Sequence, residues 1–360
     1  MYVAVLTSPL QIFNFIEYLN SFARPCGLIE WTVILPIEQN YSKGLGTVGD
    51  FLRAEAGCKI HFFIGLPGKK VGFNKIVKRI LFARTYKRTI DDILGDHKLV
   101  ENLVIGDYRS RECRHLIACC SRANVTLLDD GSATHQIAKY LDSPKSFSLS
   151  PMFPRMDIHG LILRFSGVSL SDKANKVMFT HYLSSEEESI AVIPHNYTYW
   201  RSQLKLRNHA YSKDILFLGL SHVETGITTK ASYIDSLKRI LDFYRGGRIL
   251  YKPHRKESIN KLNDISALGY KVLDVEIMPV EYKLLHGKEL PMEVASIASS
   301  ALDNLPILFG RKLTCRCFVP QQSYCTRKMR AHFSDILSYH QQTSSQLGLN
   351  ISYLDSRADI

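Results

Sequence analysis

The sequence predicts an α/β protein built from two Rossmann-like halves, each with a parallel sheet and crossover helices. Short β-rich runs alternate with helical patterns over the first 140 residues, and a second alternating series begins near residue 215. Such alternation is typical of parallel sheets, because a parallel strand pair needs a crossover connection. With 360 residues, 45% of them hydrophobic, the chain is long enough for two packed domains.

In the first half, the expected strands follow β-branched and aromatic runs, and the expected helices follow apolar residues spaced by three and four. The strands are expected at 3–6, 31–35, 60–64, 103–105 and 125–128, and the helices at 10–22, 48–56, 74–84, 110–121 and 133–140. Prolines interrupt the pattern from about 142 to 212, so we expect an irregular connection there.

The second half repeats the alternation. Strands are expected at 215–218, 248–251, 271–273 and 306–310, and helices at 229–244 and 258–266. We place the domains at 1–205 and 206–325. Residues 326–360 are expected to form a helix that packs back on the N-terminal domain.

The net charge of +12 is concentrated in residues 69–88, which hold eight basic residues and no acidic one. Apolar residues in this segment fall at helical spacing, so it is predicted to be a basic amphipathic helix. Such a helix suits an anionic membrane surface, a polyanionic substrate or nucleic acid, or is a docked helix with a solvated basic face. No base-reading or stacking-aromatic motif accompanies it, so no nucleic-acid partner is expected.

Composition also bears on compartment and cofactors. The N-terminus lacks the basic flank of a signal peptide, no apolar run approaches bilayer length, and eight irregularly spaced cysteines fit a reduced compartment. We therefore expect a cytoplasmic protein, peripheral on the inner membrane face. Cys315, Cys317 and Cys325, with His332 beyond them, match no common zinc spacing, so no metal is expected.

A formal G-x-G-x-x-G at Gly44, Gly46 and Gly49 trails its strand by many residues, and the next strand supplies no acidic residue for a ribose. The motif therefore does not predict a nicotinamide or flavin cofactor.

Two acidic residues, Asp129 and Asp130, follow the strand expected at 125–128. The carboxyl ends of parallel strands face the ligand crevice, so one carboxylate there can act as a general base. Alternatively, an aspartate caps the following helix, and Gly131 supplies a permissive backbone.

The run "KPHR" follows the strand expected at 248–251. Pro253 fixes the backbone before His254, and Lys252 and Arg255 flank the histidine with positive charge. This loop suits a phosphate, with His254 as a hydrogen-bond donor or as a proton source for a leaving group.

A third polar stretch contains Glu281, at the start of a short helical run, and Ser299 and Ser300, at the expected start of another helix. Free amides and hydroxyls at a helix N-terminus can bind phosphate, and Glu281 could accept the hydroxyls of a ribose. The alternative is a serine-rich helix cap.

The four signals, in order, are "TSPLQIFNFIEYL", "DDG", "KPH" and "E…SS". This set resembles the bacterial sialyltransferases, including the polysialyltransferase-like proteins of capsule and lipooligosaccharide synthesis, which share a [D/E]-[D/E]-G, an H-P and a Ser-Ser motif. The resemblance implies a GT-B architecture, in which two Rossmann-like domains face a central cleft. It also implies that CMP-sialic acid binds mainly to the C-terminal domain.

On this resemblance, Asp130 is the base that takes the acceptor proton, Asp129 is its support or alternative, and His254 assists departure of the CMP phosphate. Ser299 and Ser300 hold that phosphate, and Glu281 contacts the cytidine ribose. Further donor contacts are implied for Lys252, Pro253, Gly219 and Ser221. The acceptor side is implied to include Ser8, Pro9, Gln11, Asn14 and Gly131. Arg255 stands where the family has proline.

The expected reaction is transfer of sialic acid from CMP-sialic acid to a hydroxyl of a surface glycan, with inversion at the anomeric carbon. A monophosphate leaving group needs no diphosphate-bound metal, so no cofactor is expected. Two alternatives stay open: a GT-B transferase that uses another sugar nucleotide, and a non-catalytic binder of anionic glycan or nucleic acid.

Overall fold

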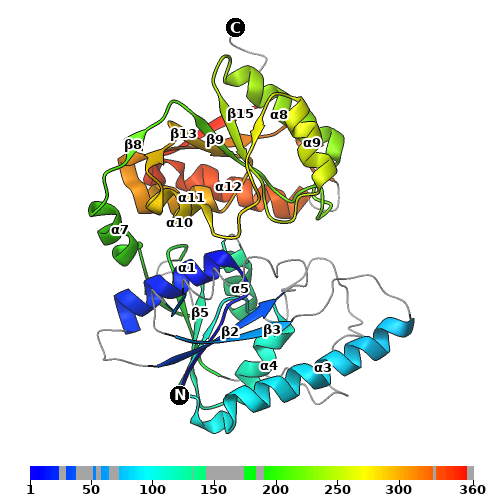
Figure 1. The fold of residues 1–360 in the computed structure, drawn as a ribbon, viewed down its shortest axis with the longest axis vertical. Helices are drawn as coiled ribbons and strands as arrows, with labels where there is room; N and C mark the ends of the chain where they lie inside the picture. Colours follow the sequence, from blue (N-terminus) through cyan, green and yellow to red (C-terminus); the bar gives the residue numbers. More distant parts are fainter. Residues whose placement is uncertain are drawn as a thin grey trace. The chain divides into compact units, whose positions relative to one another are not determined.

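A computed structural model describes residues 1–23, 30–37, 52–53, 58–64, 73–131, 133–142, 174–183, 190–326 and 330–354. The chain divides into two compact units, Met1–His195 and Asn196–Ile360. Each unit contains a parallel β-sheet with helices in its strand connections (Figure 1).

Within the described residues, the sheet of the first unit has seven parallel strands in the order β3-β2-β1-β4-β5-β6-β7. These strands are β1 (Tyr2–Val5), β2 (Trp31–Ile37), β3 (Lys59–Ile64), β4 (Asn102–Ile105), β5 (Asn124–Leu128), β6 (Lys176–Thr180) and β7 (Ala191–Pro194). The helices are α1 (Pro9–Tyr18), α3 (Phe73–Leu94), α4 (Arg111–Cys119) and α5 (Ala133–Asp142). A π-helical turn covers Leu19–Ala23, a 3-10 turn covers His97–Leu99, and residues 52–53 are also helical.

The strand order explains where a ligand edge lies in the first unit. Strand β1 pairs with β2 on one side and with β4 on the other, so the chain changes direction across the sheet between β1 and β4. In parallel sheets, the crevice beyond the carboxyl ends of the strands at such a switch point is where ligands bind. Alternate residues of the central strands, such as Val3, Leu103 and Val125, are fully buried and hold this edge in place.

The second unit has a sheet of six parallel strands among its described residues, in the order β11-β10-β9-β13-β14-β15, with its switch point between β9 and β13. Its strands are β9 (Ile215–Leu218), β10 (Ile249–Lys252), β11 (Lys271–Val272), β13 (Glu293–Ser296), β14 (Thr314–Val319) and β15 (Leu349–Tyr353). Its helices are α7 (Thr198–Lys205), α8 (Lys230–Phe243), α9 (Ile259–Ala267), α10 (Val280–His286), α11 (Ala301–Phe309) and α12 (Arg330–Leu347). Strands β8 (Ala210–Tyr211) and β12 (Glu289–Leu290) form a separate parallel pair, and 3-10 turns cover Gly310–Lys312 and Gln322–Tyr324.

The structure corrects two expectations. Strands β6 and β7, helix α7 and strand β8 occupy the described part of the connection that was expected to be irregular. The run 306–310 continues helix α11 instead of forming a strand, because a short apolar run does not distinguish a buried helix from a buried strand. Helix α12 packs against α11 and β15 of its own unit, because it is the crossover that β14 and β15 need to pair in parallel.

The basic segment 69–88 is helical over the part that the structure describes, where it forms most of α3. Residues 69–72, the glycines of the formal G-x-G-x-x-G and all but residues 52–53 of the helix expected at 48–56 lie outside the described residues. None of the helices described has the length and apolar character that crossing a bilayer requires.

Candidate functional site

The carboxylate of Asp130 lies at the switch edge of the first unit, directly after β5. Its Oδ1 accepts a hydrogen bond from Gln11 Nε2 at 2.7 Å, and its Oδ2 accepts one from the guanidinium of Arg109. The Gln11 oxygen in turn accepts from the amide and hydroxyl of Thr7, at 2.6 and 3.0 Å. Groups that follow β1, β4 and β5 therefore converge on one carboxylate.

A glycine allows this convergence. A Cβ at Gly106, just beyond β4, would lie 2.1 Å from the Gln11 side-chain oxygen, so a larger residue would push Gln11 away from Asp130. Arg109 is held by Asp107, whose Oδ1 accepts from the Arg109 amide at 3.0 Å and from Nε at 3.1 Å.

The surroundings of Asp130 set its proton affinity. Burial and the nearby charge of Asp107 raise the pKa of Asp130 to about 6, against the opposing effects of Arg109 and Gln11. The side chain is 13% exposed, so the carboxylate is accessible from solvent. A carboxylate with a pKa just below neutral is suited to accept a proton near pH 7.

Asp129 lies in a different environment, inside the protein. Its Oδ2 accepts from the backbone amide of His181 at 3.1 Å and lies 3.1 Å from His195 Nε2, while Asn14 donates to its backbone carbonyl at 3.0 Å. Although burial alone raises the pKa of Asp129, the hydrogen bond from His195 and the charges of both histidines hold it below its ordinary value. Asp129 is 1% exposed and ties the end of β5 to the ends of β6 and β7.

The expected acceptor residues have structural contacts. Ser8 caps α1 by accepting from the Gln11 amide at 3.3 Å, and Pro9 is the first residue of that helix. Gln11 and Asn14 are buried, so they support the two aspartates instead of presenting surface. Gly131 has a φ of +62°, which confirms the permissive backbone expected after the aspartates.

In the second unit, Lys252 is the last residue of β10 and is only 9% exposed. Within the described part of the chain its ammonium has no hydrogen-bond or ion-pair partner. Burial lowers the pKa of Lys252, and the more distant carboxylates of Glu276 and Glu281 oppose that effect. An ammonium that is largely shielded from water and lacks such a partner would be stabilised by an anionic ligand.

Glu281, in the first turn of α10, is also buried. Its Oε1 accepts from Asn304 Nδ2 of α11 at 2.7 Å. Burial raises the pKa of Glu281, and Asn304 and the charge of Lys252 oppose this. Glu281 therefore holds the start of α11 and balances Lys252.

His254 lies in the loop after β10 and is half-buried. Its Nδ1 accepts from the Lys256 amide at 3.1 Å, so the neutral ring carries its proton on Nε2. Burial and the charges of Arg255 and Lys256 lower the pKa of His254 to about 4. Without a bound anion, His254 is thus a neutral hydrogen-bond donor.

The serine pair directly precedes α11. Ser300 is the N-cap residue, and the Ser299 hydroxyl accepts from the Ala301 amide at 3.3 Å. Ala298 has a φ of +63°, a conformation that is strained for a residue with a Cβ and that clusters at functional sites. Cap and ligand functions are compatible here, because a serine hydroxyl that accepts one amide can still donate its own proton.

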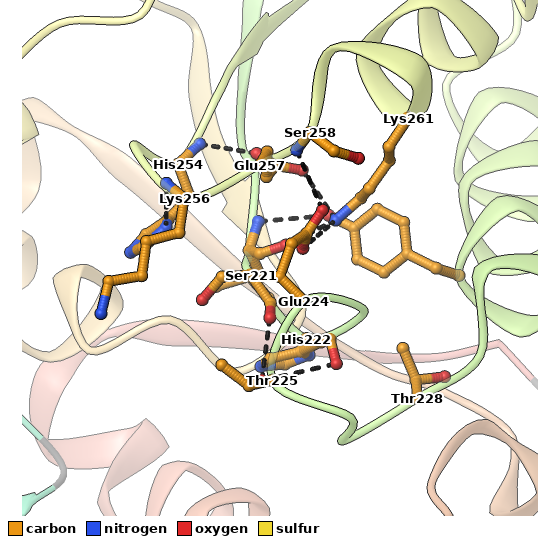
Figure 2. A network of polar contacts seen from close by, with 12 residues as sticks. Ser221, His222, Glu224, Thr225, Thr228, His254, Lys256, Glu257, Ser258 and Lys261 are labelled. Carbon is orange, nitrogen blue, oxygen red and sulfur yellow. Dashed lines mark hydrogen bonds and ion pairs between the residues drawn. The ribbon is translucent and has the colours of Figure 1, made fainter. Parts of the chain in front are cut away.

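Gly219 follows β9 and donates to the Lys252 carbonyl at 2.9 Å. A Cβ at Gly219 would lie 2.3 Å from Oε2 of Glu257, so only glycine fits between the two loops. Ser221 follows at the same edge, where its carbonyl accepts from the Thr225 hydroxyl at 2.8 Å (Figure 2).

The sequence analysis missed Asp107, Arg109, Glu257 and Lys261. The first two follow β4 in the run "GDYRS", in the same strand-end position that singled out Asp129 and Asp130. Among the described residues no group of three or more histidine, cysteine, aspartate or glutamate side chains could hold a metal ion.

No protein-family model matches the chain, and no curated protein sequence matches it either. Among solved structures, a Phytolacca americana UGT2 complexed with UDP-2-fluoro-glucose and pterostilbene has a TM-score of 0.50 and 13% identity over 97% of this chain and 85% of its own. This likeness confirms the class of the fold: two Rossmann-like parallel sheets, as in GT-B glycosyltransferases.

Two further solved structures are similar at lower TM-scores. A UDP-N-acetylglucosamine 2-epimerase has a TM-score of 0.49 and 12% identity over 98% of this chain and 83% of its own. The GT-B domain of a Photobacterium damselae sialyltransferase has a TM-score of 0.43 and 13% identity over 98% of this chain and 100% of its own.

Proposed function

We propose that the protein is an inverting glycosyltransferase that moves sialic acid from CMP-sialic acid to a hydroxyl of a surface glycan, such as a bacterial lipooligosaccharide or capsule. The observation that carries this proposal is the carboxylate of Asp130. It lies at the switch edge of the first unit, it is fixed by Gln11 and Arg109, and its pKa of about 6 leaves it ionised near neutral pH.

Asp130 acts as the general base. The acceptor hydroxyl gives its proton to the Asp130 carboxylate while the hydroxyl oxygen forms a bond to the anomeric carbon of the donor. The bond between that carbon and the phosphate oxygen of CMP breaks on the opposite face, and CMP leaves with the bonding electron pair. A single displacement of this kind inverts the configuration at the anomeric carbon.

The donor phosphate is assigned to the switch edge of the second unit. The ammonium of Lys252, the Nε2 proton of His254, the hydroxyls of Ser299 and Ser300 and the positive end of the α11 dipole are suited to a phosphate. A bound phosphate would raise the pKa of His254, because a nearby negative charge favours the imidazolium. Histidine could then donate a proton to the departing phosphate.

Further donor contacts are proposed at Glu281, Gly219, Ser221 and Pro253. We assign to Glu281 the role of accepting hydrogen bonds from the ribose hydroxyls. It would use the carboxylate oxygen that does not accept from Asn304. Metal is not required, because the monophosphate charge is met by Lys252 and by the helix N-terminus.

Transfer assays test this proposal. The protein is incubated with CMP-sialic acid and a panel of galactosides and sialosides, and CMP release and sialylated products are measured. Asp130→Asn should abolish transfer and leave CMP binding intact, because the base acts on the acceptor. The matched control is Glu101→Gln, an exposed acid of the same unit, which should retain full activity. A wild-type protein that neither binds CMP nor releases it would contradict the proposal.

A different donor is the second candidate. The solved structure with a TM-score of 0.50 contains UDP-2-fluoro-glucose, which makes a UDP-sugar the alternative to test. Competition binding with CMP, UDP and GDP distinguishes the donors, since preference for a nucleoside diphosphate would exclude CMP-sialic acid. Filter binding with RNA, DNA and polysialic acid over a salt titration tests a non-catalytic anion binder.

We also propose that the basic segment 69–88 brings the enzyme to an anionic membrane surface. The part of α3 that begins at Phe73 supports a helix there, and Arg84 and Arg88 are exposed. Replacing its basic residues by glutamine should reduce binding to phosphatidylglycerol vesicles and leave activity on soluble acceptors unchanged. Unchanged vesicle binding would refute the membrane role.

A further inference from the structure

A buried polar network joins the two loops that carry the proposed donor residues of the second unit. One loop, residues 219–229, follows β9, and the other, residues 253–258, follows β10. Figure 2 shows the ammonium of Lys261 close to the carboxylates of Glu224 and Glu257. We call the side chains of Glu224, Tyr233, Tyr251, Glu257 and Lys261 the Lys261 network.

Lys261 lies in the first turn of α9 and is 1% exposed. Its ammonium donates to the Leu220 carbonyl at 2.7 Å, lies 2.8 Å from Glu257 Oε1 and 3.4 Å from Glu224 Oε2, and lies 3.9 Å above the Tyr233 ring. The N-terminus of a helix carries a partial positive charge, which repels the Lys261 ammonium. The contacts with Leu220, Glu257 and Glu224 compensate for that repulsion.

Glu257 connects the same ammonium to the other loop. Its side chain is fully buried, its Oε2 accepts from the His254 amide at 2.6 Å, and its Oε1 accepts from the Tyr251 hydroxyl at 2.6 Å. The Tyr251 hydroxyl contacts that of Tyr233 at 2.8 Å, and Tyr233 accepts from the Leu220 amide at 3.2 Å. The network therefore binds both the amide and the carbonyl of Leu220, and also the amide of His254.

A carboxylate–ammonium pair of this kind is a costly way to gain stability. Desolvation of the two charges offsets most of their attraction, and apolar side chains of equal volume would fill the space as well. The pair instead fixes the positions of two loops, because Lys261 donates to the Leu220 carbonyl and Glu257 accepts from the His254 amide. Gly219 shows how close this fit is, since a Cβ there would meet Glu257 Oε2 at 2.3 Å and the Tyr251 hydroxyl at 2.6 Å.

We infer that Glu257 and Lys261 are positioning residues, which hold the His254 loop and the Gly219–Ser221 loop in the arrangement that binds the phosphate-bearing donor. The inference rests on the proposed function for the identity of that ligand. Glu257 fixes the backbone of His254, so that Nε2 keeps its direction. Lys261 fixes Leu220, so that its neighbours in the chain, Gly219 and Ser221, keep their places, with Gly219 bonded to the Lys252 carbonyl.

The experiment combines donor binding with a measurement that needs no donor. Variants Lys261→Met and Glu257→Gln each remove one charge, and the double variant removes both, which avoids leaving an unpaired buried charge. The matched control is Lys230→Met, which removes the exposed ion pair between Lys230 and Asp264 of the same helix α9. Calorimetry gives the CMP affinity, transfer kinetics give KM and kcat, and amide hydrogen exchange reports the two loops in the free protein.

Loss of a hydrogen bond to a charged group should weaken CMP binding and raise the donor KM by about tenfold or more in each single variant. The acceptor KM should stay within about twofold, because the acceptor is assigned to the other unit. The His254 and Leu220 amides should exchange faster, and the His254 imidazole resonances should shift. In Lys261→Met the pKa of His254 should also rise, because the charge of Lys261 helps to lower it. Lys230→Met should change none of these quantities.

Folded variants with wild-type CMP affinity and wild-type loop exchange would overturn the inference. So would a lower melting temperature without any change in the loops or in donor KM, since the network would then only stabilise the unit. If the loops loosen in the variants but the wild-type protein binds no CMP, the proposed donor is wrong and the positioning of the loops stands.

Discussion

Replacement of Asp130 by asparagine should abolish transfer and also stabilise the first unit. Burial and Asp107 raise the pKa of Asp130 from 3.8 to about 6, which at 1.36 kcal/mol per pKa unit corresponds to about 3 kcal/mol. Between these two pH values the folded protein binds more protons at this site than the unfolded chain. Stability therefore falls as pH rises through this window, and the full cost of ionised Asp130 is present above pH 6.

Asparagine removes that cost, because it is neutral and fills the same space. The variant should be more stable than the wild type by about 1.5 kcal/mol at pH 5 and by about 3 kcal/mol at pH 7. Arg109 keeps its contacts with Asp107, which limits the loss caused by the missing charge.

Urea denaturation at both pH values measures this difference. The chain has two tryptophans, Trp31 in the first unit and Trp200 in the second, so a Trp200→Phe background makes fluorescence report the first unit alone. Glu101→Gln is the control and should change neither stability nor its pH dependence. The reasoning fails if Asp130→Asn is less stable than the wild type at pH 7, or if the difference is the same at both pH values.

Three further predictions follow from the same geometry. The kcat/KM for transfer should rise with pH to a plateau, with an apparent pKa near 6, because ionised Asp130 is the base; a flat profile between pH 5 and 7 would exclude it. Asp129→Ala should destabilise the protein by about 3 kcal/mol in urea denaturation, since it leaves buried donors unpaired, and an effect under about 1 kcal/mol would contradict that contact set. Lys252→Met should weaken CMP binding about tenfold or more in calorimetry and leave the stability of the free protein unchanged or higher; unchanged CMP affinity would remove Lys252 from the donor site.

The sequence predicts the strands of the first half up to β5, and β9 and β10 of the second, because each is a short apolar run followed by a turn. It does not predict β13 (Glu293–Ser296), which lies beside β9 at the centre of the second sheet. The strand expected at 215–218 is β9 as observed, and the one expected at 125–128 begins one residue earlier in the structure. The last two strands of the second sheet were missed for different reasons. Strand β14, "TCRCFV", carries an arginine within its pattern, and β15, "LNISY", is only partly apolar. Neither segment has the continuous apolar run of a buried strand. Both nevertheless join the sheet, because β14 pairs with β13 and β15 pairs with β14.

The candidate site was predictable where a residue follows a recognised strand. Asp129, Asp130, Lys252 and His254 were predicted in this way, whereas Arg109 lies four residues beyond the end of β4, inside a turn, and was missed. The difference between the two aspartates was not available from sequence. Burial and partners that lie 52 and 66 residues away distinguish Asp129 from Asp130, and only the fold brings these partners together.

Lys261 and Glu257 show a second reason why some residues near the candidate site were not predicted from the sequence. A lysine and a glutamate four residues apart at a helix start suggest an ordinary solvated surface pair. Their burial follows from the loop after β9, which is far away in sequence and covers them through Leu220 and Glu224.

The contact between Asp129 and His195 fixes the end of the first unit. His195 is the last residue of that unit, and its Nε2 lies 3.1 Å from the Asp129 carboxylate. Asn14 of α1 also donates to the Asp129 carbonyl. One buried residue therefore joins the helix after β1, the strand end that carries the proposed base and the last residue of the first unit.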